Sequence, residues 1–338
     1  MKHLRSVSLL AAVALVATAC GASSGTARPS ATVIQSSSPG TSGSAAAGVA
    51  CDPQASGQAT AYPGWPGAVV SDSEIIPSLV STELGVGENR FLFTVLDRQN
   101  QPLPAPDVAV DLRFFELAGD PATPTSETKA TFLPATEGRG LYRASVDFRC
   151  AGDWGVEMTV RKSGVADRTA RGVFPVRATT STPPIGAKMA PLDTPTAPPA
   201  DVRTLSTDTN PDPDFYRTSV RQALDAKKPF LFVIATPAFC KTRTCGPALD
   251  VVKQAASPFK DRVAFINVEP YQLRMEGSSL QPVLDPQGQL QPVELVNELG
   301  LTTEPYTFAV DRTGTIVAKF EGVVGRDELD AVLGRISR

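Results

Sequence analysis

The stretch between residues 230 and 250 restricts the fold of this chain more than any other stretch. Residues 230–235 form an unbroken apolar run, rich in aromatic and β-branched side chains and bounded by two prolines. Such a run predicts a strand buried on both faces, as in a sheet covered on both sides. Beyond Pro247 the apolar residues follow helical spacing. Cys240 and Cys245 therefore lie where a central strand connects to a helix, the place where open α/β sheets carry their chemistry.

The rest of the chain from about residue 204 continues the α/β pattern. A parallel partner strand is expected after the helix, by the crossover rule for such units, and a polar insertion is expected over residues 270–290. Asp212 or Asp214 is expected to cap the first helix. The predicted elements are helices over 212–226, 247–257, 293–299 and 327–336, and strands over 230–235, 262–268, 306–310 and 316–320.

Three local features of this region resemble the thioredoxin fold, over roughly residues 212–338. Cys240 follows a buried strand, Pro247 comes seven residues later, and Glu304-Pro305 precedes the last hairpin. The resemblance implies that Cys240 is the attacking thiol and Cys245 the resolving one. It also implies that Pro305 is a cis-proline shaping the substrate edge. Glu304 is placed to relay a proton, although its charge opposes thiolate formation.

The spacing of the two cysteines departs from thioredoxins, because four residues separate them where the family has two. Residues five apart on a regular helix lie about 140° apart around its axis, so both thiols cannot bond from one regular helix. Two positions remain possible for the start of the helix. A start near Lys241 follows the family, whereas a start at Pro247 follows the preference of proline for the first helical position.

The N-terminal residues predict an exported, lipid-anchored protein. Residues 1–19 have a basic start, an apolar core and a small-residue end, which is typical of a secretory signal. The segment ending at Cys20 resembles a bacterial lipobox, with Ala17 where that pattern prefers leucine. Residues 20–50 are rich in Gly, Ser, Ala and Thr and are expected to form a disordered tether.

Composition excludes several function classes. Removal of residues 1–19 leaves 30 basic and 35 acidic side chains, a net charge of −5, and takes away the only histidine. A Cys-His or Ser-His pair and a histidine-ligated zinc or copper site are therefore excluded. The mild acidity argues against nucleic acid as a partner. No cofactor or metal is predicted.

Residues 51–178 predict an all-β sandwich. Gly140-Leu141-Tyr142 and Gly152-Asp153-Trp154-Gly155 resemble immunoglobulin-like modules of bacterial envelope proteins. The aromatic residues are expected to pack in the core rather than bind a ligand; they are Trp65, Phe114, Phe115 and Trp154. Strands are predicted over 91–96, 108–115, 141–148, 156–160 and 173–176.

The four remaining cysteines allow three ways of forming two disulfides, and the domain division selects one of the three. Cys51 is expected to form a structural disulfide with Cys150 inside the sandwich, and Cys240 is expected to pair with Cys245. Residues 179–203, rich in Pro and Thr, predict an extended linker between the sandwich and the domain of residues 204–338.

The predicted function is thiol-disulfide exchange through Cys240 and Cys245 on the outer side of a bacterial cell membrane. The partners would be exported proteins with cysteines, or a membrane redox protein. The alternative is a binding or scaffold lipoprotein in which the same pair is a structural disulfide. A peroxidase is disfavoured because Val233 and Pro237 break the peroxiredoxin signature. A copper chaperone is disfavoured by the missing histidine.

Overall fold

The computed structural model describes residues 49–51, 62–65, 75–97, 99–102, 108–136 and 139–338. All of them belong to one compact unit, Gly43–Arg338. The predicted signal peptide, Cys20 and nearly all of the tether lie outside the described residues. No helix of the described chain combines the length and the hydropathy needed to cross a membrane.

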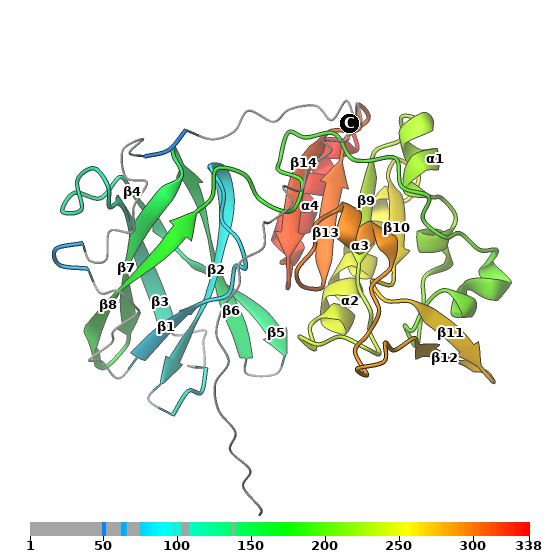
Figure 1. Cartoon of the computed structure of the whole chain (residues 1–338), viewed down its shortest axis with the longest axis horizontal. Helices are drawn as coiled ribbons and strands as arrows, with labels where there is room; N and C mark the ends of the chain where they lie inside the picture. Colours follow the sequence, from blue (N-terminus) through cyan, green and yellow to red (C-terminus); the bar gives the residue numbers. More distant parts are fainter. Residues whose placement is uncertain (1–48, 52–61, 66–74, 98, 103–107, 137–138) are drawn as a thin grey trace, which may run out of the picture. The chain divides into compact units, whose positions relative to one another are not determined.

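The first part of the described chain is a sandwich of two four-stranded antiparallel sheets (Figure 1). One sheet has the order β1-β2-β6-β5 and the other β4-β3-β7-β8. The strands are β1 Ile75–Leu79, β2 Gly87–Asp97, β3 Val108–Glu116, β4 Ser126–Lys129, β5 Thr131–Thr136, β6 Arg139–Phe148, β7 Gly152–Lys162 and β8 Val165–Val176.

The five predicted strands are present, and the three that the sequence analysis missed all lie at sheet edges. β1 contains Pro77 and β5 contains Pro134, and proline is tolerated in a sheet mainly at its edge. β4 is short and polar, with no buried side chain. Edge strands need neither an apolar run nor a regular alternation of apolar and polar residues, so the sequence gives only a weak signal for them.

The aromatic residues of the sandwich pack in its interior. Trp154 and Phe114 are at most 1% exposed and belong to the main core between the sheets. Trp65 and Phe115 pack edge to face in a smaller cluster, with their ring centroids 4.8 Å apart. The expectation that these four side chains form core rather than a ligand-binding patch agrees with their burial.

The second part of the described chain is built on a mixed four-stranded sheet of order β10-β9-β13-β14. β9 and β10 are parallel, and β13 is antiparallel to both β9 and β14. The elements are η1 Pro199–Thr204, η2 Pro213–Tyr216, α1 Val220–Asp225, β9 Phe230–Ile234, α2 Cys245–Ala256, η3 Ser257–Phe259, β10 Ala264–Val268, β11 Leu273–Glu276, β12 Ser279–Pro282, α3 Glu294–Glu298, β13 Tyr306–Val310, β14 Ile316–Glu321 and α4 Arg326–Ile336.

Both faces of this sheet are covered, which explains why β9 is apolar without alternation. Leu231 and Val233 of β9 face a core that includes side chains of α2 and α4. Phe230, Phe232 and Ile234 face a second core that includes side chains of α1. The sandwich followed by a mixed α/β region confirms the predicted fold at this level.

Two segments have a structure that differs from the prediction. The helix predicted over residues 212–226 is divided: Asp212 caps η2, and Ser219 begins α1 with a capping box. A second strong cap inside the predicted span starts a new helix at that point. The predicted insertion over residues 270–290 contains an antiparallel hairpin, β11–β12, that its polar sequence did not reveal.

The predicted linker lies against the α/β region instead of spanning open solvent. Met189 and Leu192 are buried in the same core as α1. The backbone of Gly186 and Met189 donates hydrogen bonds to Ile316 and Gly314, at the β13–β14 hairpin. The prolines keep this segment extended, and its few apolar side chains attach it to the sheet.

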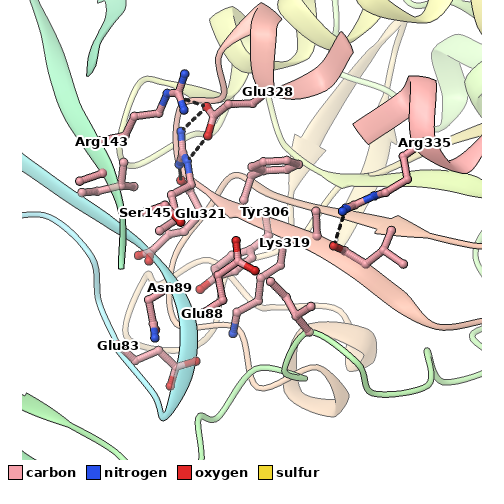
Figure 2. Close-up of a pocket in the computed structure, with 17 residues that line it drawn as sticks. Glu83, Glu88, Asn89, Arg143, Ser145, Tyr306, Lys319, Glu321, Glu328 and Arg335 are labelled. Carbon is pink, nitrogen blue, oxygen red and sulfur yellow. Dashed lines mark hydrogen bonds and ion pairs between the residues drawn. The ribbon is translucent and has the colours of Figure 1, made fainter. Parts of the chain in front are cut away.

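A largely buried arginine joins β2 to α4. The Arg90 guanidinium makes two hydrogen bonds to Glu328, of 2.7 and 2.8 Å, and donates to the carbonyl oxygens of Glu321 and Val323. Its side chain is 13% exposed, and that of Glu328 is 9% exposed. A pocket of about 260 Å³ lies beside this ion pair, with Arg143, Lys319 and Arg335 among its lining residues (Figure 2).

Arg90→Ala is expected to lower the free energy of unfolding by about 2 kcal/mol. It removes the closest ion pair of Glu328 and the donor to two carbonyl groups, while Glu328 keeps the Gly325 N–H and the nearby Arg143. Urea denaturation followed by circular dichroism measures the loss. Arg326→Ala is the control, since its ion pair with Asp330 is exposed on both sides and is worth less than about 1 kcal/mol. Equal losses for the two variants would contradict a specific role of the buried pair.

Candidate functional site

The two cysteines of the α/β region lie next to its central strand. β9 is flanked by β10 and β13, and the loop after it carries Cys240. Cys245 is the first residue of α2. The structure therefore places both cysteines at the carboxyl end of the strand, as the apolar run predicted.

Cys240 and Cys245 are joined by a disulfide, with their Cα atoms 5.9 Å apart. The two sulfur atoms differ in environment. Cys245 is completely buried, whereas Cys240 is only half-buried. The backbone N–H of Cys245 donates to Cys240 Sγ at 3.2 Å. This N–H belongs to the first turn of α2, where backbone donors have no partner within the helix and favour negative charge.

Helix α2 begins between the two predicted starts. Its N-cap is Thr244, and Pro247 is the third helical residue. The N–H groups of the first turn have no partner within a helix, so proline at this position costs no hydrogen bond. Cys240 therefore lies in the loop and Cys245 on the helix, and the disulfide spans the helix start without any unwinding.

Glu304 holds the cysteine loop from the opposite side. Its Oε1 accepts the N–H of Lys241 at 2.8 Å, and its Oε2 accepts the hydroxyl of Tyr271 at 2.9 Å. The peptide bond from Glu304 to Pro305 is cis, and both residues are buried. Burial and the bond to Glu304 raise the pKa of Tyr271, so its hydroxyl remains a donor at neutral pH. The Glu304 carboxylate thus links the cysteine loop, through Lys241, to Tyr271.

Threonine hydroxyls surround the half-buried sulfur. Thr242 Oγ1 lies 3.2 Å from Cys240 Sγ, donates to the carbonyl of Glu304 at 2.9 Å, and is 2.8 Å from Thr244 Oγ1. While its hydroxyl donates to the Glu304 carbonyl, Thr242 can accept a hydrogen bond from the thiol of a reduced Cys240. Rotation of the hydroxyl would instead let it donate to a thiolate. This chain of hydroxyls can follow a change of charge at Cys240 without any movement of the backbone.

A second buried carboxylate, Glu269, lies at the end of β10. Its Oε1 accepts the N–H and the hydroxyl of Thr207, and the Thr207 hydroxyl accepts the N–H of Ala238 in the cysteine loop. Burial raises the pKa of Glu269, while the hydrogen bonds from Thr207 and the nearby Thr236 hydroxyl oppose that rise. Yet Glu269 Oε2 and Thr236 Oγ1 have no hydrogen bond of normal geometry within the described chain. The Thr236 hydroxyl is thus close to the carboxylate but poorly aligned with it.

Glu269→Gln is expected to stabilise the protein by about 1 kcal/mol at pH 7, because its amide can donate to Thr236. The raised pKa means that the native state holds this proton more tightly than the unfolded chain does. Stability is therefore lost as pH rises above the ordinary pKa of glutamate and through the native one. The variant should lack this loss. The midpoints of urea unfolding between pH 5 and pH 8 measure this loss of stability in the wild type and in the variant. The exposed Glu298→Gln is the control. A variant less stable than wild type across this range would contradict the prediction.

Three residues of this site were not predicted from the sequence, namely Tyr271, Thr242 and Glu269. Glu269 left the clearest signal, as an acidic residue directly after a buried strand. Tyr271 lies in a segment that looked like a polar insertion, and nothing in the sequence relates it to Glu304.

In the sandwich, Cys51 and Cys150 form a second disulfide, with Cα atoms 4.8 Å apart and a sequence separation of 99. The N–H of Cys51 donates to Ala151 at 2.8 Å, and Trp154 donates to the Cys150 carbonyl at 3.1 Å. A Glu116 oxygen lies within 4.8 Å of both sulfur atoms, but the two sulfurs bond to each other and Glu116 pairs with Arg149. The bond connects the start of the described chain to the residues between β6 and β7.

Comparison with known proteins identifies one part of the chain. A family model described as YtkA-like matches residues 77–159, from β1 into β7, so this part of the sandwich region is similar to YtkA-like domains. No curated protein matches the chain. One similar solved structure is the soluble domain of PmoD from Methylocystis sp. ATCC 49242 (Rockwell), at 17% identity and a TM-score of 0.22. The match covers 32% of this chain and 96% of that one.

Proposed function

We propose that this protein carries out thiol-disulfide exchange through Cys240 and Cys245. The observation that carries the proposal is the asymmetry of the pair. Cys240 is half-buried and accepts an N–H of the α2 N-terminus, whereas Cys245 is completely buried behind it. An accessible, stabilised thiolate next to a buried partner is the arrangement that exchange requires.

The proposed reaction transfers two electrons. In the reduced protein the Cys240 thiolate attacks one sulfur of a client disulfide, forming a mixed disulfide and releasing the other client sulfur as a thiolate. Cys245, after losing its proton, then attacks the Cys240 sulfur. The Cys240–Cys245 bond re-forms, and the client leaves with both sulfurs reduced. The reverse sequence oxidises a client, so the relative potentials of the pair and its client decide the direction.

A thioredoxin-like fold of the α/β region belongs to the same proposal. The strand order β10-β9-β13-β14, the parallel β9 and β10, and the cis bond before Pro305 support it. The wider spacing of the cysteines is accommodated because α2 begins at Cys245 instead of immediately after Cys240. Two disulfides in one chain support an extracytoplasmic location, where such bonds persist.

A reduction-potential titration with mass-spectrometric mapping of both disulfides tests this function. We expect the Cys240–Cys245 pair to have a potential between about −270 and −120 mV, the range of known exchange proteins. Cys51–Cys150 is the internal control and is expected below about −300 mV, as for structural disulfides. A Cys240–Cys245 potential in that lower range would identify the pair as a structural bond and favour a binding module.

The proposal places the protein at the membrane through a lipid on Cys20, with exported cysteine-containing proteins or a membrane redox protein as partners. Cys20→Ser is expected to move essentially all of the protein from the membrane fraction to the soluble fraction, because a tether alone has no affinity for a bilayer. Immunoblots of the separated fractions measure the shift. Unchanged retention of the variant would show that another segment holds the protein.

A further inference from the structure

The segment of residues 270–293 forms an arm attached directly to the proposed exchange site. At its base Tyr271 pairs with Pro292 in an isolated bridge. The Tyr271 hydroxyl donates to Glu304, which also accepts the N–H of Lys241. The position of the arm is thus linked to the residue after Cys240 by two hydrogen bonds through one carboxylate.

A pocket of about 270 Å³ lies between this arm, α3 and the cysteine loop. Lys241 and Thr242 of the cysteine loop line the pocket, together with Glu304 from the segment before the cis-proline. The apolar part of the lining comes from half-buried side chains of the arm and of α3 and its flank, namely Leu290, Val296 and Leu301. The volume is slightly below the usual range of small-ligand sites, about 300–1,000 Å³, and is large enough to hold one bulky apolar side chain.

The charges at the mouth of this pocket favour an acidic ligand. Lys241 is exposed and its ammonium lies 5.4 Å from the centre of the Tyr271 ring. Arg243 is exposed in the same loop. Neither residue makes an ion pair with any other described residue, and the nearby Glu304 carboxylate is buried and bonded through both oxygens. An acidic side chain beside the pocket would therefore meet the uncompensated Lys241, with the exposed Arg243 two residues further along the same loop.

We propose that the arm and this pocket select clients, and that the preferred client is a polypeptide segment with a leucine-sized apolar residue and an acidic residue flanking its cysteine. The apolar side chain occupies the pocket, and the acidic one lies against Lys241 and Arg243. This inference rests on the proposed exchange function, because it assigns the pocket to the client that reacts with Cys240.

Peptide binding to the oxidised wild-type protein tests the selection separately from the chemistry. Ten-residue peptides would carry serine in place of the reactive cysteine, flanked by Leu and Glu in either order. Two comparison peptides replace Glu by Lys, or Leu by Ser. Competition against a labelled Leu-Ser-Glu peptide, read by fluorescence anisotropy, ranks their affinities. We expect each replacement to weaken binding about tenfold, which corresponds to 1.4 kcal/mol.

Variants of the protein assign the effect to these residues. Lys241→Glu should reverse the preference between the Glu and Lys peptides, and Val296→Ser should remove the preference for Leu over Ser. Arg312→Glu is the matched control: it reverses an exposed charge in the turn at the far end of β13 and should change neither preference. Equal binding of all the peptides, or equal effects of Lys241→Glu and Arg312→Glu, would overturn the inference.

Kinetics separate this inference from the function on which it rests. The reduced protein is allowed to react with a small neutral disulfide and with cysteine peptides carried as mixed disulfides. Fast reaction with the small disulfide, without a preference among peptides, would retain exchange and reject client selection. Absence of any reaction would reject exchange, and the binding of the serine peptides would still decide whether the pocket recognises acidic, apolar segments.

Discussion

Cys245→Ser is expected to trap a stable mixed disulfide between Cys240 and its client, and Cys240→Ser is expected to trap none. The structure supplies the reason. Cys245 is completely buried, so a client sulfur cannot reach it, whereas Cys240 is half-buried. Once Cys240 has attacked a client, Cys245 is the only cysteine of the α/β region left to resolve the bond.

Loss of either thiol should abolish turnover, with a decrease of at least about 10³-fold in a disulfide-reduction assay, because neither serine forms a thiolate or a disulfide. Non-reducing electrophoresis of cells expressing each variant, followed by mass spectrometry, detects the trapped complexes. The Cys240→Ser/Cys245→Ser double variant is the control, since it should show neither complexes nor turnover. Trapping by Cys240→Ser alone would reverse the roles of the cysteines. Absence of trapping together with full biological activity of the double variant would show that the pair is structural.

Removal of the Cys51–Cys150 disulfide is expected to destabilise the sandwich by about 4–5 kcal/mol. The bond closes a loop with a sequence separation of 99, and a loop of about 100 residues corresponds to 4.7 kcal/mol in the chain-entropy model. The Cys51→Ala/Cys150→Ala double variant avoids a free thiol. It leaves the nearby hydrogen bond from Trp154 to the residue 150 carbonyl possible.

Tryptophan fluorescence during urea unfolding measures this loss in the sandwich alone, because both tryptophans of the chain, Trp65 and Trp154, are buried there. The matched control is Cys240→Ala/Cys245→Ala. Its fluorescence transition should not shift, since that disulfide lies in the α/β region and closes a short loop. A shift of less than about 1 kcal/mol after loss of Cys51–Cys150 would show that the backbone contacts at Cys51 hold the start of the chain without the bond.

Much of the α/β region was predictable because its strands are buried on both faces. The predicted strand over 306–310 coincides with β13, and the strands over 230–235 and 262–268 differ from β9 and β10 by at most two residues. The edge strands β1, β4 and β5 were missed because polar residues and proline are allowed there. In the helix that carries Cys245, local preferences favoured a start at Pro247 and the family pattern one near Lys241. The structure starts it at Cys245, since a proline at the third helical position loses no hydrogen bond.

The sequence by itself determined which residues are the candidates for chemistry. A central strand followed by two cysteines, a proline before the last hairpin, and the absence of histidine after residue 19 restrict the candidate site to a thiol pair. Only the tertiary structure decided how the two thiols differ and what surrounds them. The burial of Cys245, the N–H donated to Cys240 and the bonds that Glu304 accepts from Lys241 and Tyr271 join segments up to 63 residues apart. Such contacts depend on the packing of the whole sheet, and no local pattern of residues encodes them.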